Sequence, residues 1–81
     1  MRYTVLLEPT AEADHPGWYY ARIPALDLTT HGFGVEGALE AARDLVDAWL
    51  GALAEQGTPA PPDRATFVSH IEATGHAVHS G

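Results

Sequence analysis

The sequence predicts an α+β domain of order β-β-β-α-β, in which one long helix lies on one face of a small antiparallel or mixed sheet. Short segments rich in aromatic and β-branched residues come before residue 33 and again after residue 64. Between them lies one long segment with helical periodicity. At 81 residues the chain is expected to be a single domain, 1–81, with a thin stability margin of its own.

Three strands are predicted in the first part of the chain. Residues 2–8 alternate between apolar and polar side chains, which is typical of a half-buried strand. Residues 18–23 have the aromatic and β-branched character of a second strand, and the breaker-rich run 10–17 predicts a loop between the two. We expect these strands to form an antiparallel hairpin, with a weaker third strand at residues 27–32.

A long amphipathic helix is predicted next. Apolar residues recur at spacings of three and four from Val35 to Leu53, and mostly acidic residues occupy the other side. The apolar stripe, Trp49 included, is expected to lie in the core. Gly57 is expected to end the helix as its C′ residue.

The last part of the chain predicts a turn and one more strand. Residues 58–63 contain three prolines, which indicates a short, stiff segment that turns the chain back. Residues 65–71 are predicted to form the fourth strand. Residues 73–81 are weakly patterned and are expected to be frayed.

Residues 32–37 match the G-x-G-x-x-G pattern of dinucleotide-binding proteins. In those proteins the helix leads to a second strand, and an acidic residue at the end of that strand binds the ribose. Here the acid at the right distance, Glu55, is still within the predicted helix. We therefore predict that the glycines serve the backbone: Gly32 for a sharp turn, Gly34 at the N-cap, and Gly37 for close packing on the sheet. No cofactor is expected.

Charge favours some partners and disfavours others. Eleven Asp and Glu face four Arg and no Lys, which gives a formal net charge of −7. A chain this acidic is repelled by nucleic acid and by anionic membrane surfaces, so both are poor partners. A basic protein is a better one.

The chain contains no cysteine, which excludes disulfides and thiolate metal ligands. Self-association is therefore the expected way for so small a domain to gain stability beyond its own core. The apolar patch near the N-terminus is too short for a signal peptide, and no segment is apolar for long enough to span a bilayer. A cytoplasmic protein is expected.

Residues of the types used in catalysis or metal binding form only weak patterns. Glu8 and Asp27 are the two carboxylates that could approach each other to hold a divalent metal ion. His76 and His79 lack two further ligands for a structural zinc site, and His31 has no nucleophile predicted beside it. We expect neither a catalytic residue nor a metal site.

The second predicted strand has large side chains on both faces. Alternation puts Trp18, Tyr20 and Arg22 on one face, with Tyr19 and Ile23 on the other. A single helix covers one face only, so the other is left without a cover inside the chain. Trp, Tyr and Arg are enriched at the centres of protein interfaces, which makes the uncovered face a candidate interface, whichever of the two it is.

Four segments resemble, in order, the motifs of HicB-type antitoxins. Residues 2–9 (RYTVLLEP) resemble the first strand of that family, and residues 17–26 (GWYYARIPAL) its second strand. Residues 30–42 (THGFGVEGALEAA) are similar to its helix entry, and residues 57–61 (GTPAP) to the turn after its helix. The resemblance implies a truncated ribonuclease-H-like fold.

The resemblance also implies a non-enzymatic, protein-binding function. The partner would be a HicA-type toxin, a small basic protein that cleaves RNA, in parallel with a homo-oligomer (dimer or tetramer). Trp18, Tyr20 and Arg22 would make the contact. Four acidic residues of the helix would attract the toxin: Glu36, Glu40, Asp44 and Asp47. Full HicB antitoxins carry a C-terminal DNA-binding domain, for which the residues after Pro62 are too few, so direct binding of nucleic acid is not expected.

Two alternatives stay open. The chain could be a stand-alone oligomeric protein of the same fold that binds some other ligand. It could also be a metal-dependent nuclease that uses clustered carboxylates, in which case Glu8 would be required for turnover.

Overall fold

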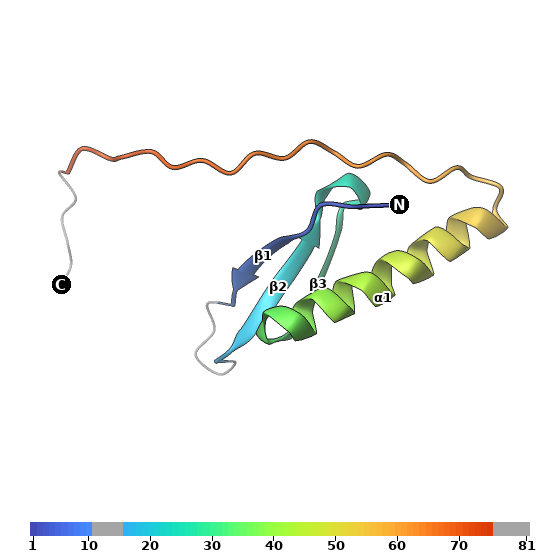
Figure 1. The fold of residues 1–81 in the computed structure, drawn as a ribbon, viewed down its shortest axis with the longest axis horizontal. Helices are drawn as coiled ribbons and strands as arrows, with labels where there is room; N and C mark the ends of the chain where they lie inside the picture. Colours follow the sequence, from blue (N-terminus) through green and yellow to red (C-terminus); the bar gives the residue numbers. More distant parts are fainter. Residues whose placement is uncertain (11–15, 76–81) are drawn as a thin grey trace.

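The computed structural model describes residues 1–10 and 16–75 and shows two layers (Figure 1). A three-stranded antiparallel sheet forms one layer, and a single long helix covers one face of it. The elements in chain order are β1 (Leu6–Pro9), β2 (Trp18–Ile23), the short 3-10 helix η1 (Pro24–Leu26), β3 (Leu28–Phe33) and α1 (Gly34–Glu55). The α+β class and the predicted order of three strands and a helix are confirmed.

The sheet has the order β1-β2-β3, so the second strand is central. Leu6 lies opposite Arg22 in the β1–β2 ladder, and Trp18 lies opposite Phe33 in the β2–β3 ladder. The short turn between β2 and β3 ends at Asp27, which takes a left-handed conformation with φ of 53°. An Asp tolerates this conformation better than most residues do, because its short polar side chain can bond locally.

The first strand is shorter than the predicted 2–8. Its ladder to β2 begins at Leu6, although the alternation is confirmed in that Tyr3, Val5 and Leu7 all pack against the core. The segment before Leu6 therefore contributes side chains to the core without pairing to β2 in the sheet.

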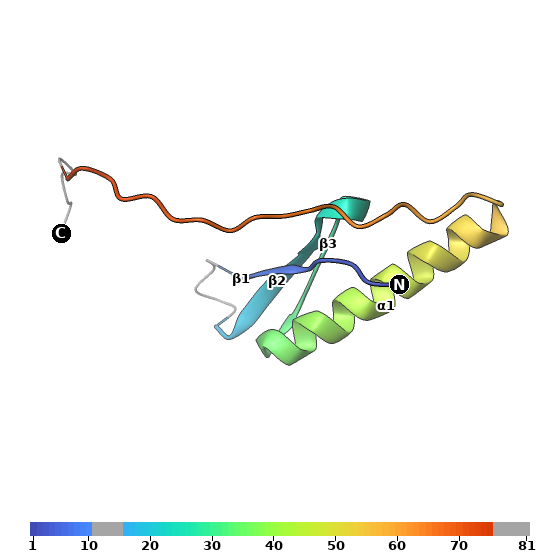
Figure 2. The ribbon, with the colours of Figure 1, turned by 45° about the horizontal axis from the view of Figure 1, so that its top comes forward.

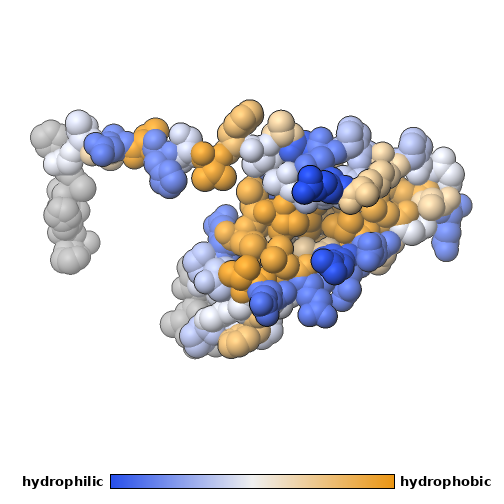
Figure 3. Space-filling model, viewed as in Figure 1, coloured by the Kyte–Doolittle hydropathy of each residue, from blue (hydrophilic) through white to orange (hydrophobic). Residues whose placement is uncertain are grey.

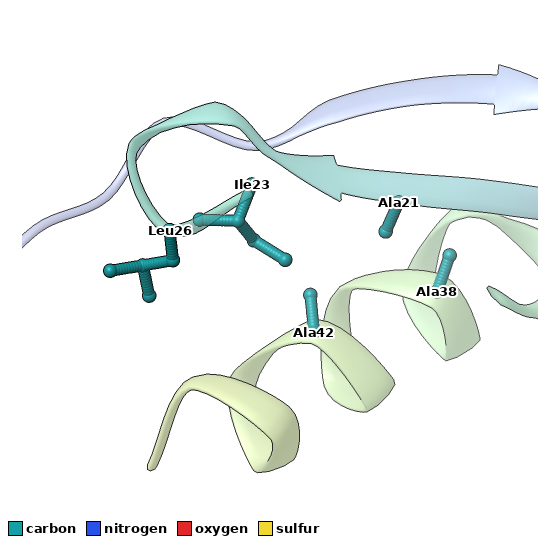
Figure 4. Packing of buried hydrophobic residues seen from close by; sticks show 5 residues of the cluster. All are labelled: Ala21, Ile23, Leu26, Ala38 and Ala42. Carbon is teal, nitrogen blue, oxygen red and sulfur yellow. The ribbon is translucent and has the colours of Figure 1, made fainter. Parts of the chain in front are cut away.

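The buried core is small and rich in alanine (Figure 4). Ala21 and Ile23 of β2 point toward Ala38 and Ala42 of α1, and Leu26 closes one end. Alanines at the contact let the helix and the sheet approach closely, but each buries little apolar surface. The monomer therefore has few large side chains with which to stabilise itself.

The close approach is greatest at Gly32. A Cβ on this residue would lie 2.5 Å from the carbonyl carbon and oxygen of Gly37. The prediction of a sharp turn at Gly32 is wrong, because this residue lies within β3; the turn into the helix comes at Gly34, which has φ of 70°. The N-cap is Phe33, one residue earlier than predicted, and the N–H of Gly34 donates to the Gly17 carbonyl at 2.7 Å.

The predicted end of the helix is confirmed. Gly57 has φ of 70° and its N–H donates to the Ala54 carbonyl at 3.1 Å. The N–H of Thr58 donates to the Leu53 carbonyl at 2.9 Å. This pair of bonds is the Schellman arrangement, in which a left-handed glycine satisfies the last carbonyls of a helix.

The prediction that the whole apolar stripe of the helix lies in the core is wrong. Val35, Leu39 and Trp49 are each more than 40% exposed, Trp49 at 43%. A helix of 22 residues is about 33 Å long, whereas a strand of six residues spans only about 20 Å. The C-terminal half of α1 therefore extends beyond the sheet (Figure 1), which accounts for the exposure of Trp49 but not for that of Val35 and Leu39 in the first two turns.

The predicted fourth strand at residues 65–71 is also wrong for this structure. Residues 58–75 contain no strand, and the chain beyond the helix runs past the sheet and away from it in both views (Figures 1 and 2). The radius of gyration is 16.5 Å, against roughly 12 Å for a compact domain of this length. Of the segment predicted to be frayed, residues 76–81 lie outside the described residues.

Candidate protein-binding face

The helix covers the β2 face that carries Ala21 and Ile23, which are both completely buried. Alternation therefore places Trp18, Tyr20 and Arg22 on the face away from α1. We call this surface the outer face; the ladder registers add neighbours from β1 and β3 to it, so that it comprises Leu6, Glu8, Trp18, Tyr20, Arg22, Thr29, His31 and Phe33. The sequence left the choice of face open, and the position of the helix decides which face is uncovered.

Four rings on the outer face contact one another across the β2–β3 ladder. The Trp18 and Phe33 centroids are 6.0 Å apart in an edge-to-face arrangement, and the Trp18 and His31 centroids are 5.5 Å apart. Tyr20 meets His31 edge-on at 6.5 Å. Each ring is held by its neighbours, so little side-chain freedom is left to lose when a partner binds.

These rings are also accessible to a partner. Phe33 is 66% exposed and Tyr20 is exposed, while Trp18 is half-buried by its neighbours. Exposed aromatic side chains that gather on one flat face are typical of an interaction site, whereas single exposed ones are common on any surface.

Arg22 lies at the end of β2 near the short turn. Its guanidinium is 4.0 Å from a carboxylate oxygen of Asp27, and both side chains are well exposed. An exposed pair at this distance contributes no more than about 1 kcal/mol. Arg22 can therefore exchange Asp27 for a group on a partner at small cost.

The four acidic residues predicted to attract a partner do not lie on the outer face. Each is exposed on α1: Glu36, Glu40, Asp44 and Asp47. All four lie on α1, which covers the other face of the sheet, so none of them lies beside the aromatic rings. The structure thus separates the predicted contact residues from the predicted attracting residues.

The carboxylates predicted as an alternative metal site are held in different surroundings. Glu8 lies opposite Tyr20 in the ladder, whereas Asp27 follows η1 and contacts Arg22. Within residues 1–10 and 16–75, no three His, Cys, Asp or Glu side chains come together in a way that could hold a metal ion. His76 and His79 lie outside the described residues.

Sequence reasoning missed His31 and Phe33 as members of the outer face. His31 was considered only as a possible base, and Phe33 only as part of the glycine pattern. Alternation within residues 28–33 could have placed both on one face, but matching them to Trp18 and Tyr20 required the register, which depends on the turn through η1.

A second feature that the sequence did not predict is a groove beside residues 1–5, which lead into β1. Its volume is about 460 Å³, and it lies between the N-terminal segment and α1. Tyr3 and Val5 form one wall, and Leu39, Ala42 and Val46 form the other. Figure 3 shows an apolar surface between the C-terminal segment and α1 on this side of the molecule.

Comparison of the chain with protein-family models, with curated proteins and with solved structures finds no match. Across the described ranges, no helix combines the length and apolar character needed to cross a bilayer.

Proposed function

We propose that the chain is a non-enzymatic, HicB-like antitoxin domain of the cytoplasm whose outer face binds a small basic toxin of the HicA type. The observation that carries this proposal is the cluster of mutually supported rings on the one sheet face that α1 leaves uncovered. The sequence motifs suggest the family of the partner, and the cluster of rings supports the outer face as the surface that binds it.

The composition of the outer face suits a protein partner. Trp, Tyr and Arg supply most of the binding energy in protein interfaces, where they lie near the centre of a water-excluding patch. Here Trp18 and Tyr20 are next-but-one neighbours on the central strand, with Arg22 at its end. Glu8 and Thr29 give the patch a polar margin that can take hydrogen bonds at the rim.

The charge of the chain suits a basic partner. With a net charge of −7 and no lysine, the domain attracts cationic proteins over distances limited by the Debye length, about 8 Å at physiological salt. Because the helix acids do not lie beside the aromatic rings, they act through the overall field of the domain and raise the association rate. The contact itself is made by the rings and Arg22.

A second candidate function is that of a stand-alone, self-associating protein of the same fold. The exposure of Phe67, Val68 and Ile71 favours self-association, because three large apolar side chains on one extended segment are left in water. Self-association of this kind does not use the aromatic rings of the outer face, so it is compatible with either function.

The test is to search for a neighbouring reading frame that encodes a small basic protein and to co-express that protein with this chain. We expect the two to co-purify at moderate salt, and Trp18→Ala to weaken the complex by about 30-fold or more, as at an interface hot spot. Trp49→Ala is the matched control, because Trp49 is a partly exposed tryptophan on α1, away from the outer face, and its loss should leave affinity unchanged.

Two results would contradict the proposal. One is a complex that tolerates Trp18→Ala as well as it tolerates Trp49→Ala. The other is turnover of RNA by the purified chain with divalent metal, abolished by Glu8→Ala, which would make the domain a nuclease.

A further inference from the structure

We propose that two copies of this chain exchange their C-terminal segments, residues 64–71, and that each segment lies along β1 and fills the groove of the other copy. The inference does not depend on the toxin-binding proposal, because it uses neither the aromatic rings of the outer face nor a second kind of protein. It names the surface through which the chain self-associates.

The exchanged segment is extended and apolar. Phe67 is 89% exposed, Val68 76% and Ile71 93%, so all three large apolar side chains of the segment are almost fully in water. Residues 64–71 lie clear of the sheet and the helix in both ribbon views (Figures 1 and 2). Residues 64–71 thus have the composition of a strand, but they are exposed to solvent and pair with no other strand.

The start of the segment is fixed beside its own N-terminal segment, and the chain after it runs away from the sheet in both ribbon views (Figures 1 and 2). The Tyr3 hydroxyl donates to the Pro61 carbonyl, and the Asp63 carboxylate accepts from the Thr4 N–H at 3.0 Å and from its hydroxyl at 2.7 Å. Residues 58–63 contain three prolines, which stiffen the hinge against folding back. A short, stiff hinge favours exchange between copies over closure on the same copy.

The receiving surface is present on every copy. β1 is an edge strand of the sheet formed by the described residues, so its side away from β2 carries backbone groups that can pair with an added strand. The groove lies just before this strand in the chain, between residues 1–5, which lead into β1, and α1. An added strand would complete the sheet and cover Leu39, which is exposed in the single chain.

The alternation of the segment fits this surface. In an extended strand Phe67 and Ile71 point to one face and Val68 to the other. The first pair would enter the groove against Leu39 and Val46, while Val68 would lie beside Leu6 on the outer side of the sheet.

The charges of the segment and the groove are also complementary. Arg2, Arg43 and Asp47 line the groove, so two of the four arginines of this acidic chain lie there. The segment begins at Arg64 and is followed by Glu72. The groove thus has an acidic residue that can attract Arg64 and basic residues that can attract Glu72. Because every copy has both parts, the exchange closes as a symmetric dimer.

The proposal can be tested by disulfide cross-linking, because the unmodified chain contains no cysteine that could form a competing disulfide. Two single variants, Leu39→Cys and Ile71→Cys, are purified with different tags, mixed, and oxidised. We expect a disulfide-linked heterodimer, because Ile71 of one chain would lie against Leu39 of the other. Glu36→Cys mixed with Ile71→Cys is the control, since Glu36 lies on the far side of α1 and should give no such product.

Mass measurement in solution completes the test. The unmodified chain is expected to be a dimer, and Phe67→Ser with Ile71→Ser should raise its dissociation constant by about 100-fold. A double Leu39→Cys, Ile71→Cys chain that forms its disulfide within a monomer would overturn the proposal, because the segment would then fill its own groove. A monomeric unmodified chain, or a dimer that survives the serine substitutions, would overturn it as well.

Discussion

The contact between β3 and the first turn of α1 makes a sharp prediction about two neighbouring glycines. A Cβ on Gly32 would lie 2.5 Å from the Gly37 carbonyl group and 2.6 Å from the Ala38 nitrogen. Ordinary contacts between such atoms are about 3.5–4.0 Å, so Gly32→Ala creates an overlap of about 1 Å. The atoms in the way are backbone, so β3 and α1 must separate, which loosens Ala38 from Ala21.

The size of the effect follows from this geometry. Overpacking of a well-packed contact costs about 1–3 kcal/mol, and we expect the upper half of that range because no flexible side chain can move aside. Each kcal/mol lowers the melting temperature of a domain this small by roughly 4–8 °C. Gly32→Ala should therefore lower it by roughly 10–20 °C.

Gly37→Ala is the matched comparison. A Cβ there would lie 3.7 Å from the Gly32 carbonyl carbon and 3.9 Å from the Phe33 Cβ, which are ordinary contacts. Alanine is favoured over glycine within a helix by about 0.8–1.0 kcal/mol, so this variant should melt roughly 4–8 °C higher than the unmodified chain.

The assay is thermal unfolding followed by circular dichroism, with all three proteins at one concentration so that any self-association is held constant. The reasoning would be refuted by equal melting temperatures for the two variants, or by a Gly32→Ala chain as stable as the unmodified one. Either result would mean that the backbones of β3 and α1 do not approach as closely as described.

Three further predictions concern the hydrogen bonds between Asp63 and Thr4, which we call the anchor, and the acidic residues of the helix. Asp63→Ala removes both hydrogen bonds to Thr4, so trypsin should cleave the chain after Arg64 several-fold faster. An unchanged cleavage rate would show that these bonds do not hold residues 64–71 in place. The Thr4 N–H, and then the Thr4 hydroxyl, lower the pKa of Asp63 in the folded chain. The anchor therefore contributes its full stability above the ordinary Asp pKa of about 3.9, and this contribution is lost as the pH falls through the lower pKa of the folded chain. The NMR chemical shift of the Thr4 amide should follow this titration, and a titration midpoint at or above the ordinary pKa would contradict the prediction. Neutralising the helix acids should lower the association rate constant for a basic partner at low salt by about tenfold and leave the dissociation rate constant unchanged. A change in the dissociation rate constant alone would instead mean that these residues contact the partner. The substitutions are Glu36→Gln, Glu40→Gln, Asp44→Asn and Asp47→Asn.

Periodicity was sufficient to predict β2, β3 and α1, because it reports local geometry. The period of two in residues 18–23 separated Trp18 and Tyr20 from Ala21 before the position of the helix was known. The Schellman glycine at the helix end was also predictable, since only a residue that tolerates positive φ satisfies those carbonyls.

The wrong predictions concern what lies beside an element. Residues 65–71 have the composition of a strand, but a strand also requires a partner edge within reach, and composition does not specify one. Trp49 is on the correct side of α1 to be core, but the spacing of apolar residues does not say where the sheet ends.

The outer face was partly predictable for the same reason. Its β2 residues followed from alternation alone, whereas His31 and Phe33 joined them only through the β2–β3 register. That register depends on the η1 turn and the left-handed Asp27, which the sequence did not indicate.

The alternation along β2 also bears on how such a domain could change its partner over time. Odd-numbered positions such as Ala21 and Ile23 maintain the architecture, and even-numbered positions such as Tyr20 and Arg22 do not touch α1. Substitutions at the even positions can therefore accumulate without disturbing folding. A single six-residue strand thus keeps the fold constant while leaving binding specificity free to diverge.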